Sequence, residues 1–344
     1  MKEQTNTKKT SFFKKIFIKI CRLFGYEIID QGNFYIPTLE KEMNENLNIQ
    51  GKKSITLPLG ETKIVRKVNA LTVIFRSCTN INMLTQNKKR LFEQNKCEYT
   101  FRSLNSIIIS LNNAKKLFPN IDIDIVVVDY NSKEKDIKQI KNQLKKTNFK
   151  NSVISLNINE FINDIKKVNA KNENVTENQI SNMSNIHKSL LIAKDRCNDL
   201  IYFVEDDYLH DPEVFSEMIF AYERISSQIN RELILCPADY PYLYTKIDPT
   251  NIFLGSNRHW RKIDQTLCTF LTSKILLEKY WEKLISMCQF EHYPFEQPLH
   301  DLYKVEYCLS PIPSLALHVT NVNSIFGLSP NIDWKKVWED NKNY

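Results

Sequence analysis

Residues 201–211 read IYFVEDDYLHD, and this stretch decides the fold because a buried strand runs directly into three consecutive carboxylates. The four residues that open it are β-branched or aromatic, a composition that favours a strand. The acids that follow are Glu205, Asp206 and Asp207, and neighbouring like charges resist joint ionisation. This pattern therefore indicates a strand whose end lies at a site that binds a cation or another ligand.

Strand-like and helix-like segments alternate on the amino-terminal side of this stretch. Strands are expected at 70–75, 123–129, 152–156 and 200–204, helices at 100–118, 132–146 and 185–197, and a loop at 169–184. Such alternation predicts an α/β fold with a mixed, mostly parallel sheet flanked by helices. Ligands of these sheets bind beyond the carboxyl ends of the strands, where the acidic triplet would lie.

Composition narrows the class of protein. The 344 residues are 42% hydrophobic, enough for one large domain with an appendage or two modest domains. The net charge of +7 comes mostly from lysines near the start, so no nucleic-acid partner is expected. The eight cysteines form no C-x-x-C pair, which favours a reducing cytoplasm over a zinc site or disulfide framework. We find no apolar stretch long enough to span a membrane and no good signal peptide.

The chain divides by pattern into four parts. Residues 1–30 include SFFKKIFIKICRLFGYEII (11–29) and predict a basic amphipathic helix. This helix either packs on the domain or lies peripherally on the anionic inner face of the membrane. Residues 31–68 are expected to form a linker or extension, 69–328 the α/β domain, and 329–344 a C-terminal tail.

Carboxylates beyond a strand suit a divalent cation. Mg²⁺ or Mn²⁺ is often held by one or two protein carboxylates together with substrate phosphates. In a continuing strand Glu205 and Asp207 project to one side and Asp206 to the other, so Asp207 could reach a metal and Asp206 a ribose. Asp211 is expected to cap the next helix, and His210 to be a surface residue. The chain has six glycines and neither a G-x-G-x-x-G nor a P-loop signature.

The stretch YFVEDDYLHDPEVF (202–215) resembles the Glu-Asp-Asp form of the DXD motif in the N-acetylglucosaminyltransferase I family of GT-A-fold glycosyltransferases. The motif covers about twenty residues, and the order of strands and helices extends the resemblance to residues 70–225 at fold level. The resemblance implies a GT-A, Rossmann-like domain with a nucleotide-sugar half at 69–210 and an acceptor half at 211–328. It also implies that Asp207 binds Mn²⁺ or Mg²⁺, that Asp206 contacts the nucleotide-sugar, and that Glu205 supports both.

The same resemblance assigns two earlier strand ends. Arg76 and Ser77 match the first strand end, which holds the nucleotide, and Asp129 matches the second, near the base or ribose. Asn185 and Lys188 precede the triplet strand and could contact ribose or phosphate. Arg76 could instead form a surface salt bridge, and Lys188 could simply be exposed.

Candidates for catalysis and acceptor binding lie further along the chain. A carboxylate must deprotonate the acceptor hydroxyl in an inverting enzyme, and we expect Glu296, then Asp301, then Asp239. The resemblance also implies a late histidine as second metal ligand, for which His318 is the candidate, and the alternative for His318 is a core histidine. Trp260 and Arg261 are expected to bind the acceptor, although Trp260 could equally be a packed core residue.

Together these features predict a metal-dependent glycosyltransferase. It would move a hexosyl or N-acetylhexosaminyl group from a UDP- or GDP-sugar to a glycan or lipid-linked acceptor, in surface polysaccharide or glycoconjugate synthesis. Two alternatives stay open: a nucleotidyltransferase acting on sugar phosphates, and a non-catalytic, membrane-associated protein that binds sugar nucleotides. A phosphoreceiver domain is disfavoured because its acidic pair belongs on the first strand, and the triplet ends about the fourth.

Overall fold

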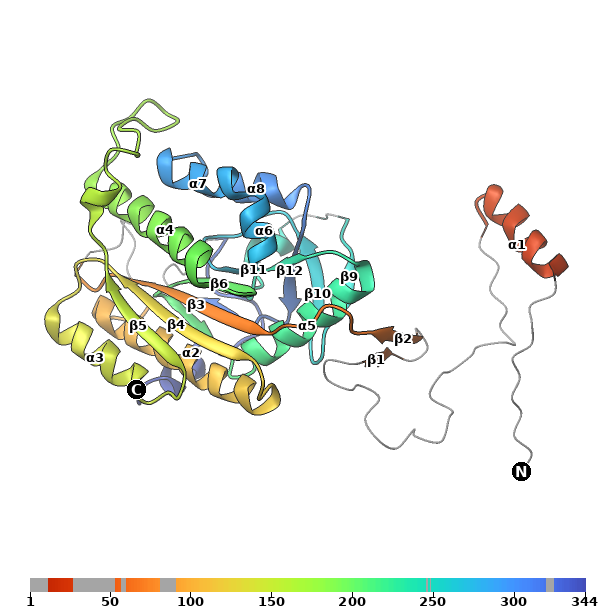
Figure 1. Ribbon diagram of the computed structural model, residues 1–344, viewed down its shortest axis with the longest axis horizontal. Helices are drawn as coiled ribbons and strands as arrows, with labels where there is room; N and C mark the ends of the chain where they lie inside the picture. Colours follow the sequence, from red (N-terminus) through yellow and green to blue (C-terminus); the bar gives the residue numbers. More distant parts are fainter. Residues whose placement is uncertain are drawn as a thin grey trace. The chain divides into compact units, whose positions relative to one another are not determined.

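The computed structural model describes residues 12–26, 53–56, 60–80, 91–245, 247, 249–319 and 325–344 (Figure 1). It divides into two units, one of Met1–Ile49 with Lys53–Glu61 and one of Gln50–Lys52 with Thr62–Tyr344. The smaller unit contains α1 (Phe12–Leu23), the helix expected near the start. β1 (Lys53–Thr56) pairs with β2 (Gly60–Lys63) in a two-stranded sheet. Within the described ranges, no helix combines the length and hydropathy that crossing a membrane requires.

The larger unit contains the α/β domain. Its strands are β3 (Ala70–Ser77), β4 (Asp122–Asp129), β5 (Lys150–Ser155), β6 (Leu200–Glu205), β7 (Tyr208–His210), β8 (Leu233–Leu235), β9 (Ile252–Leu254), β10 (His259–Ile263), β11 (Phe270–Ser273), β12 (Tyr307–Ile312) and β13 (Ala316–His318). Its helices are α2 (Lys96–Leu117), α3 (Glu134–Leu144), α4 (Glu177–Arg196), α5 (Val214–Ile229), α6 (Lys274–Lys279), α7 (Trp281–Gln289), α8 (Gln297–Tyr303) and α9 (Trp334–Asp340), with 3₁₀ turns η1 (Ile158–Glu160) and η2 (Pro241–Tyr244).

One nine-stranded sheet organises this unit, in the order β5-β4-β3-β6-β11-β8-β12-β10-β9. β10 and β11 run opposite to their neighbours, and the rest share one direction. Helices α2, α3 and α5 cover one face of the sheet, and α4, α6 and α7 cover the other (Figure 1). The predicted α/β fold with a mostly parallel sheet is therefore confirmed. β3 and β6 are buried along almost their whole length, as strands covered on both faces must be.

Two helices begin earlier than the sequence pattern indicated. α2 begins at Lys96, one turn before the expected start at residue 100. α4 begins at Glu177, inside the expected loop, because Thr176 and Gln179 form a capping box that satisfies its first backbone groups. Each added turn brings polar side chains toward the end of β6.

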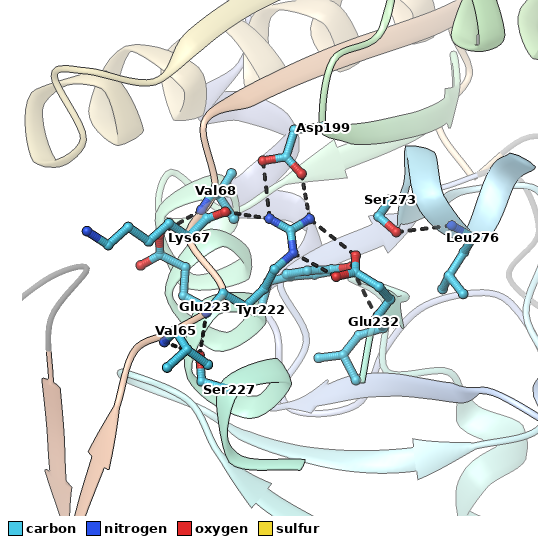
Figure 2. Close-up of polar contacts among 12 residues, drawn as sticks. Val65, Lys67, Val68, Asp199, Tyr222, Glu223, Ser227, Glu232, Ser273 and Leu276 are labelled. Carbon is cyan, nitrogen blue, oxygen red and sulfur yellow. Dashed lines mark hydrogen bonds and ion pairs between the residues drawn. The ribbon is translucent and has the colours of Figure 1, made fainter. Parts of the chain in front are cut away.

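The chain enters the sheet through a half-buried charge cluster at the edge opposite the acidic triplet. Arg66 donates to Asp199, before β6, and to Glu232, before β8, at 2.5 and 2.7 Å (Figure 2). The backbone N–H of Val68 donates to Glu223 at 2.9 Å. These contacts fix the start of β3, so the last residues of the expected linker belong to the larger unit.

The segment expected to be a C-terminal tail carries α9, which packs against the first turns of α2. Trp338 lies in a small apolar cluster with Tyr99, and Arg102 donates to the Trp338 carbonyl at 2.6 Å. The hydroxyl of Tyr344 donates to Glu98 at 2.6 Å. The end of the chain thus positions the beginning of α2.

Candidate active site

Glu205 ends β6 and is paired with a buried arginine. Arg76 lies directly opposite Glu205 in the β3–β6 register, and its Nη2 is 2.8 Å from Glu205 Oε1. Its Nη1 donates to Asn182 on α4 at 3.0 Å. Burial disfavours the charged guanidinium, yet the carboxylates, led by Glu205, hold the pKa of Arg76 above its ordinary value. Arg76 therefore forms the ion pair that the alternative interpretation expected, although its guanidinium is buried rather than at the surface.

Asp206 is held by side chains from α2. Its Oδ1 accepts a hydrogen bond from Lys96 Nζ, and its Oδ2 accepts from Thr100 Oγ1 at 2.7 Å and from the Cys78 N–H at 3.2 Å. Lys96 and Thr100 are four residues apart, so they lie on one face of the helix. Neither residue was among the predicted site residues, and Lys96 lay outside the expected helix, which began at Thr100. Their spacing, with the lysine in the first turn, was the available signal.

Asp207 lies against His318, which comes from β13. Pairing of β13 with β7 places His318 opposite Tyr208, and the Val319 N–H donates to the Asp207 carbonyl at 3.0 Å. His318 Nε2 is 3.4 Å from Asp207 Oδ2, and its Nδ1 is 2.8 Å from the Phe326 carbonyl. Burial alone would lower the pKa of His318, but the Asp207 carboxylate raises it above its usual value. The structure therefore brings both predicted metal ligands together.

Asp207 and His318 could supply part of a metal site, and their chemistry suits a divalent cation. Among the described residues, no group of three or more His, Cys, Asp and Glu side chains could hold a metal alone. Asp207 and His318 offer one carboxylate and one imidazole, a donor set that suits Mn²⁺ and related ions. The hydrogen bond at Nδ1 directs Nε2 toward Asp207, as in the outer-shell contacts of histidine ligands. Substrate oxygens and water would have to complete such a site.

Glu296 lies near these groups, at the residue before α8. Its Oε1 is 4.0 Å from the sulfur of buried Cys268. Burial raises the pKa of Glu296 to about 7, the charge of Glu205 adds to the rise, and Arg76 and His318 oppose it. A carboxyl group with this pKa can exchange a proton near neutral pH. Asp301, by contrast, is bonded to Lys304 at the surface, and that contact lowers its pKa.

The other residues predicted to contact the nucleotide mostly form hydrogen bonds or ion pairs within the protein. Asp129 Oδ1 accepts from Ser77 Oγ at 2.6 Å and from Ser132 Oγ at 2.5 Å, which joins the ends of β3 and β4. Asn185 donates to the Val128 carbonyl at 3.2 Å. Lys188 forms an ion pair with Glu160 at 3.0 Å. Asp129, Ser77 and the Val128 carbonyl that Asn185 contacts lie at the carboxyl edge of the sheet, whereas Lys188 is paired with Glu160.

Asp239, the third predicted base, follows β8 and is almost completely buried. It accepts hydrogen bonds from Arg261 Nη2 and from Tyr244 Oη, both at 2.5 Å. Trp260, in contrast, has no exposed surface, and its indole N–H donates to Glu217 at 3.1 Å. The prediction that Trp260 contacts an acceptor is therefore wrong, because a ring without exposed surface cannot stack on a sugar.

Two residues beside the triplet also differ from expectation in part. His210 is buried, not at the surface, and its ring nitrogens lie 2.7 Å from Tyr202 Oη and 3.1 Å from Ser106 Oγ. Burial lowers the pKa of His210 to about 3, so this histidine is neutral. Asp211 accepts from the Glu213 N–H at 2.8 Å and so stabilises the turn that leads into α5.

Comparisons with known proteins do not assign the chain to a family. No family model matches the sequence, and no curated protein matches it. The inositol-1-phosphate CTP transferase from T. maritima has a TM-score of 0.37 and 11% identity, covering 79% of this chain and 96% of that one. Galactosyltransferase LgtC, in complex with donor and acceptor sugar analogs, has a TM-score of 0.32 and 11% identity, covering 67% of this chain and 65% of that one. S. aureus TarS has a TM-score of 0.32 and 15% identity, covering 61% of this chain and 29% of that one. At these scores none of the similarities carries the functional argument.

Proposed function

We propose that the chain is a metal-dependent glycosyltransferase that moves a sugar from a nucleoside-diphosphate sugar to a hydroxyl group. The observation that carries the proposal is the Asp207–His318 pair at the carboxyl edge of the sheet, near a carboxyl group with a pKa of about 7. One carboxylate and one imidazole leave coordination positions for diphosphate oxygens. The acidic triplet with this partner supports the resemblance to GT-A enzymes.

The roles follow from the surroundings of each side chain. Asp207 and His318 would hold a divalent cation, which would compensate negative charge on the departing nucleoside diphosphate. Glu296, as carboxylate, takes the proton from the acceptor hydroxyl. The acceptor oxygen then bonds to the anomeric carbon, while the carbon–oxygen bond to phosphate breaks and its electron pair leaves with the nucleoside diphosphate. Arg76 and Lys96 form ion pairs with Glu205 and Asp206 and so hold these two carboxylates in place.

Binding of UDP or GDP tests the metal assignment. Calorimetry with Mn²⁺ should give binding that falls at least tenfold in Asp207→Asn and in His318→Ala. Asp195→Asn is the matched control, because Asp195 is an exposed carboxylate on α4. Binding that is equal with EDTA and with Mn²⁺, or unchanged in Asp207→Asn, would contradict the proposal.

Product analysis separates the two transferase classes. The proposed enzyme releases UDP or GDP when a sugar nucleotide and an acceptor are supplied. A nucleotidyltransferase would instead release pyrophosphate from a nucleoside triphosphate and a sugar 1-phosphate. Pyrophosphate release that depends on Asp207 would replace our proposal with that alternative. Nucleotide-sugar binding without either product would favour a binding protein.

We also propose that α1 binds an anionic membrane surface. The large apolar side chains of this helix are exposed, with Phe13 at 79% and Leu23 at 86%, and Lys19 and Arg22 add positive charge. An amphipathic basic helix of this kind gains both apolar burial and attraction to anionic lipids. Vesicles with phosphatidylglycerol should co-sediment the full chain more than vesicles of phosphatidylcholine alone. Equal co-sedimentation after deletion of residues 1–30 would contradict this proposal, and a lowered melting temperature would indicate packing on the domain.

A further inference from the structure

Tyr244 is an exposed aromatic residue held in place by two charged side chains. It ends η2, and its side chain is 52% exposed. Its hydroxyl donates to Asp239 Oδ2 at 2.5 Å, and the guanidinium of Arg261 lies 4.6 Å from the centre of its ring. Arg261 itself donates to Asp239 Oδ1. The ring is therefore fixed at its edge by a hydrogen bond and on one face by a cation.

Burying Asp239 and Arg261 together is a poor way to stabilise the fold. Burying a carboxylate and a guanidinium carries a desolvation penalty that their mutual attraction often only offsets. Burial indeed raises the pKa of Asp239, although Tyr244 and Arg261 oppose that rise. In the structure, the two charged side chains hold the Tyr244 ring in one orientation while the ring stays exposed. Restraint before binding lowers the entropy lost when a ligand packs on the ring.

The segment that carries the restrained ring is connected to the candidate active site. Tyr240 follows Asp239 in the chain, and its hydroxyl is 2.7 Å from that of Tyr208, whose ring stacks on His318 at 4.8 Å. A second connection runs through neighbouring carbonyl groups. Ile325 O accepts from the Tyr242 N–H at 3.0 Å, and Phe326 O accepts from His318. Tyr244 thus lies in the predicted acceptor half, and its neighbours Tyr240 and Tyr242 connect it to the surroundings of His318.

We propose that Tyr244 is a stacking platform for a pyranose ring of the acceptor, and that Asp239 and Arg261 are its positioning residues. Pyranose rings present faces of C–H groups, which pack well on aromatic faces. Exposed Ile252, the register partner of Arg261, extends the apolar surface beside the platform. The acceptor class is then a saccharide rather than a simple alcohol. This inference rests on the proposed function, and it moves Asp239 from the role of base to that of support.

Saturation-transfer NMR with chitotriose and maltotriose, in the presence of UDP and Mn²⁺, tests the platform. At least one saccharide should receive saturation at its ring C–H protons in the wild type. Tyr244→Ala should weaken that binding at least tenfold, and Tyr244→Phe should keep it within about threefold. Arg261→Met should weaken it less than Tyr244→Ala does, because the ring remains but is less restrained.

Tyr293→Ala is the matched control, because Tyr293 is also exposed and lies under a lysine, Lys171, 3.4 Å from the ring centre. Its saccharide binding should equal that of the wild type. Equal saturation transfer in Tyr244→Ala and wild type would overturn the inference, as would a wild type that binds UDP but neither saccharide. A wild type that binds neither UDP nor GDP in the presence of Mn²⁺ would instead count against the proposed function. Melting temperatures of all variants show whether each one is folded.

Discussion

Arg76 and Glu205 face each other across β3 and β6, with Nη2 and Oε1 2.8 Å apart. This pair answers the electrostatic question that three adjacent acids raise. Each acid has a different partner from a different element: Arg76 on β3, Lys96 on α2 and His318 on β13. The repulsion is relieved within the protein, and the imidazole partner is the one that a metal ion could share.

Replacing Arg76 by methionine should destabilise the fold. The change leaves Glu205 at the end of β6 without its cation, and removing one partner of a buried pair costs about 3 kcal/mol. Urea denaturation measures the free energy of unfolding. Lys150→Met is the control, because its ion pair with Asp124 has an exposed lysine and should change stability by less than about 1 kcal/mol. Equal effects of the two substitutions would show that the buried pair contributes no special stability.

His210 should make the protein less stable in mild acid. Its folded pKa is about 3 against 6.5 in the unfolded chain, so the unfolded state binds the extra proton as pH falls. Between pH 7 and pH 5 this costs about 2 kcal/mol, at about 1.4 kcal/mol per pH unit. His210→Gln should remove that dependence. An identical change in unfolding free energy between pH 7 and 5 in variant and wild type would contradict the neutral, buried state.

Glu296 should act on stability with the opposite sign. Its folded pKa of about 7 lies above its ordinary 4.5, so the folded state holds the proton and loses stability as pH rises from 5 to 7. The expected loss is about 2 kcal/mol. Glu296→Gln should remove it, which makes the variant relatively more stable at pH 8. If Glu296 is also the base, kcat/KM of the wild type falls tenfold per pH unit below about pH 7. A variant with wild-type kcat would eliminate Glu296 as the base.

Gly255 should not tolerate a side chain. A Cβ there would lie 2.0 Å from Glu217 Oε1 and 2.5 Å from the indole nitrogen of Trp260. Glu217 also accepts the N–H groups of Ser256 and Asn257, so it cannot move without losing those bonds. Gly255→Ala should cost about 2–3 kcal/mol of unfolding free energy. The neighbouring Ser256→Ala, at an exposed side chain, should cost less than about 0.5 kcal/mol. Similar values for both would show that the loop adjusts freely.

The sequence predicted the sheet because its strands are long apolar runs with clear ends. β3, β4 and β6 lie within about two residues of their expected bounds, since burial on both faces demands continuous hydrophobicity. Asp207 could also be selected as a metal candidate because it follows a strand, and the family resemblance added the late His318. Their contact was not predictable from local pattern. It depends on the pairing of β7 with β13, across more than a hundred residues.

Side-chain roles were harder to predict than elements. The hydrogen-bond partners of Trp260 and His210 cannot be predicted from the local sequence. In the structure Trp260 is bonded to buried Glu217, and His210 to buried Tyr202. Lys96 was missed because the start of α2 is fixed by α9, from the other end of the chain. Such long-range packing overrides local signals, which explains why the expected surface and acceptor residues were misplaced.

The pairing of β7 with β13 also sets an order of events during synthesis. Asp207 is made early, but its partner His318 and the contacts from α9 come from the last part of the described chain. A ribosome-bound fragment can complete β3, β4 and β6 while the Asp207–His318 pair is still impossible. The nucleotide binding that we propose would therefore be acquired only after β13 has joined β7, and shorter chains would lack it.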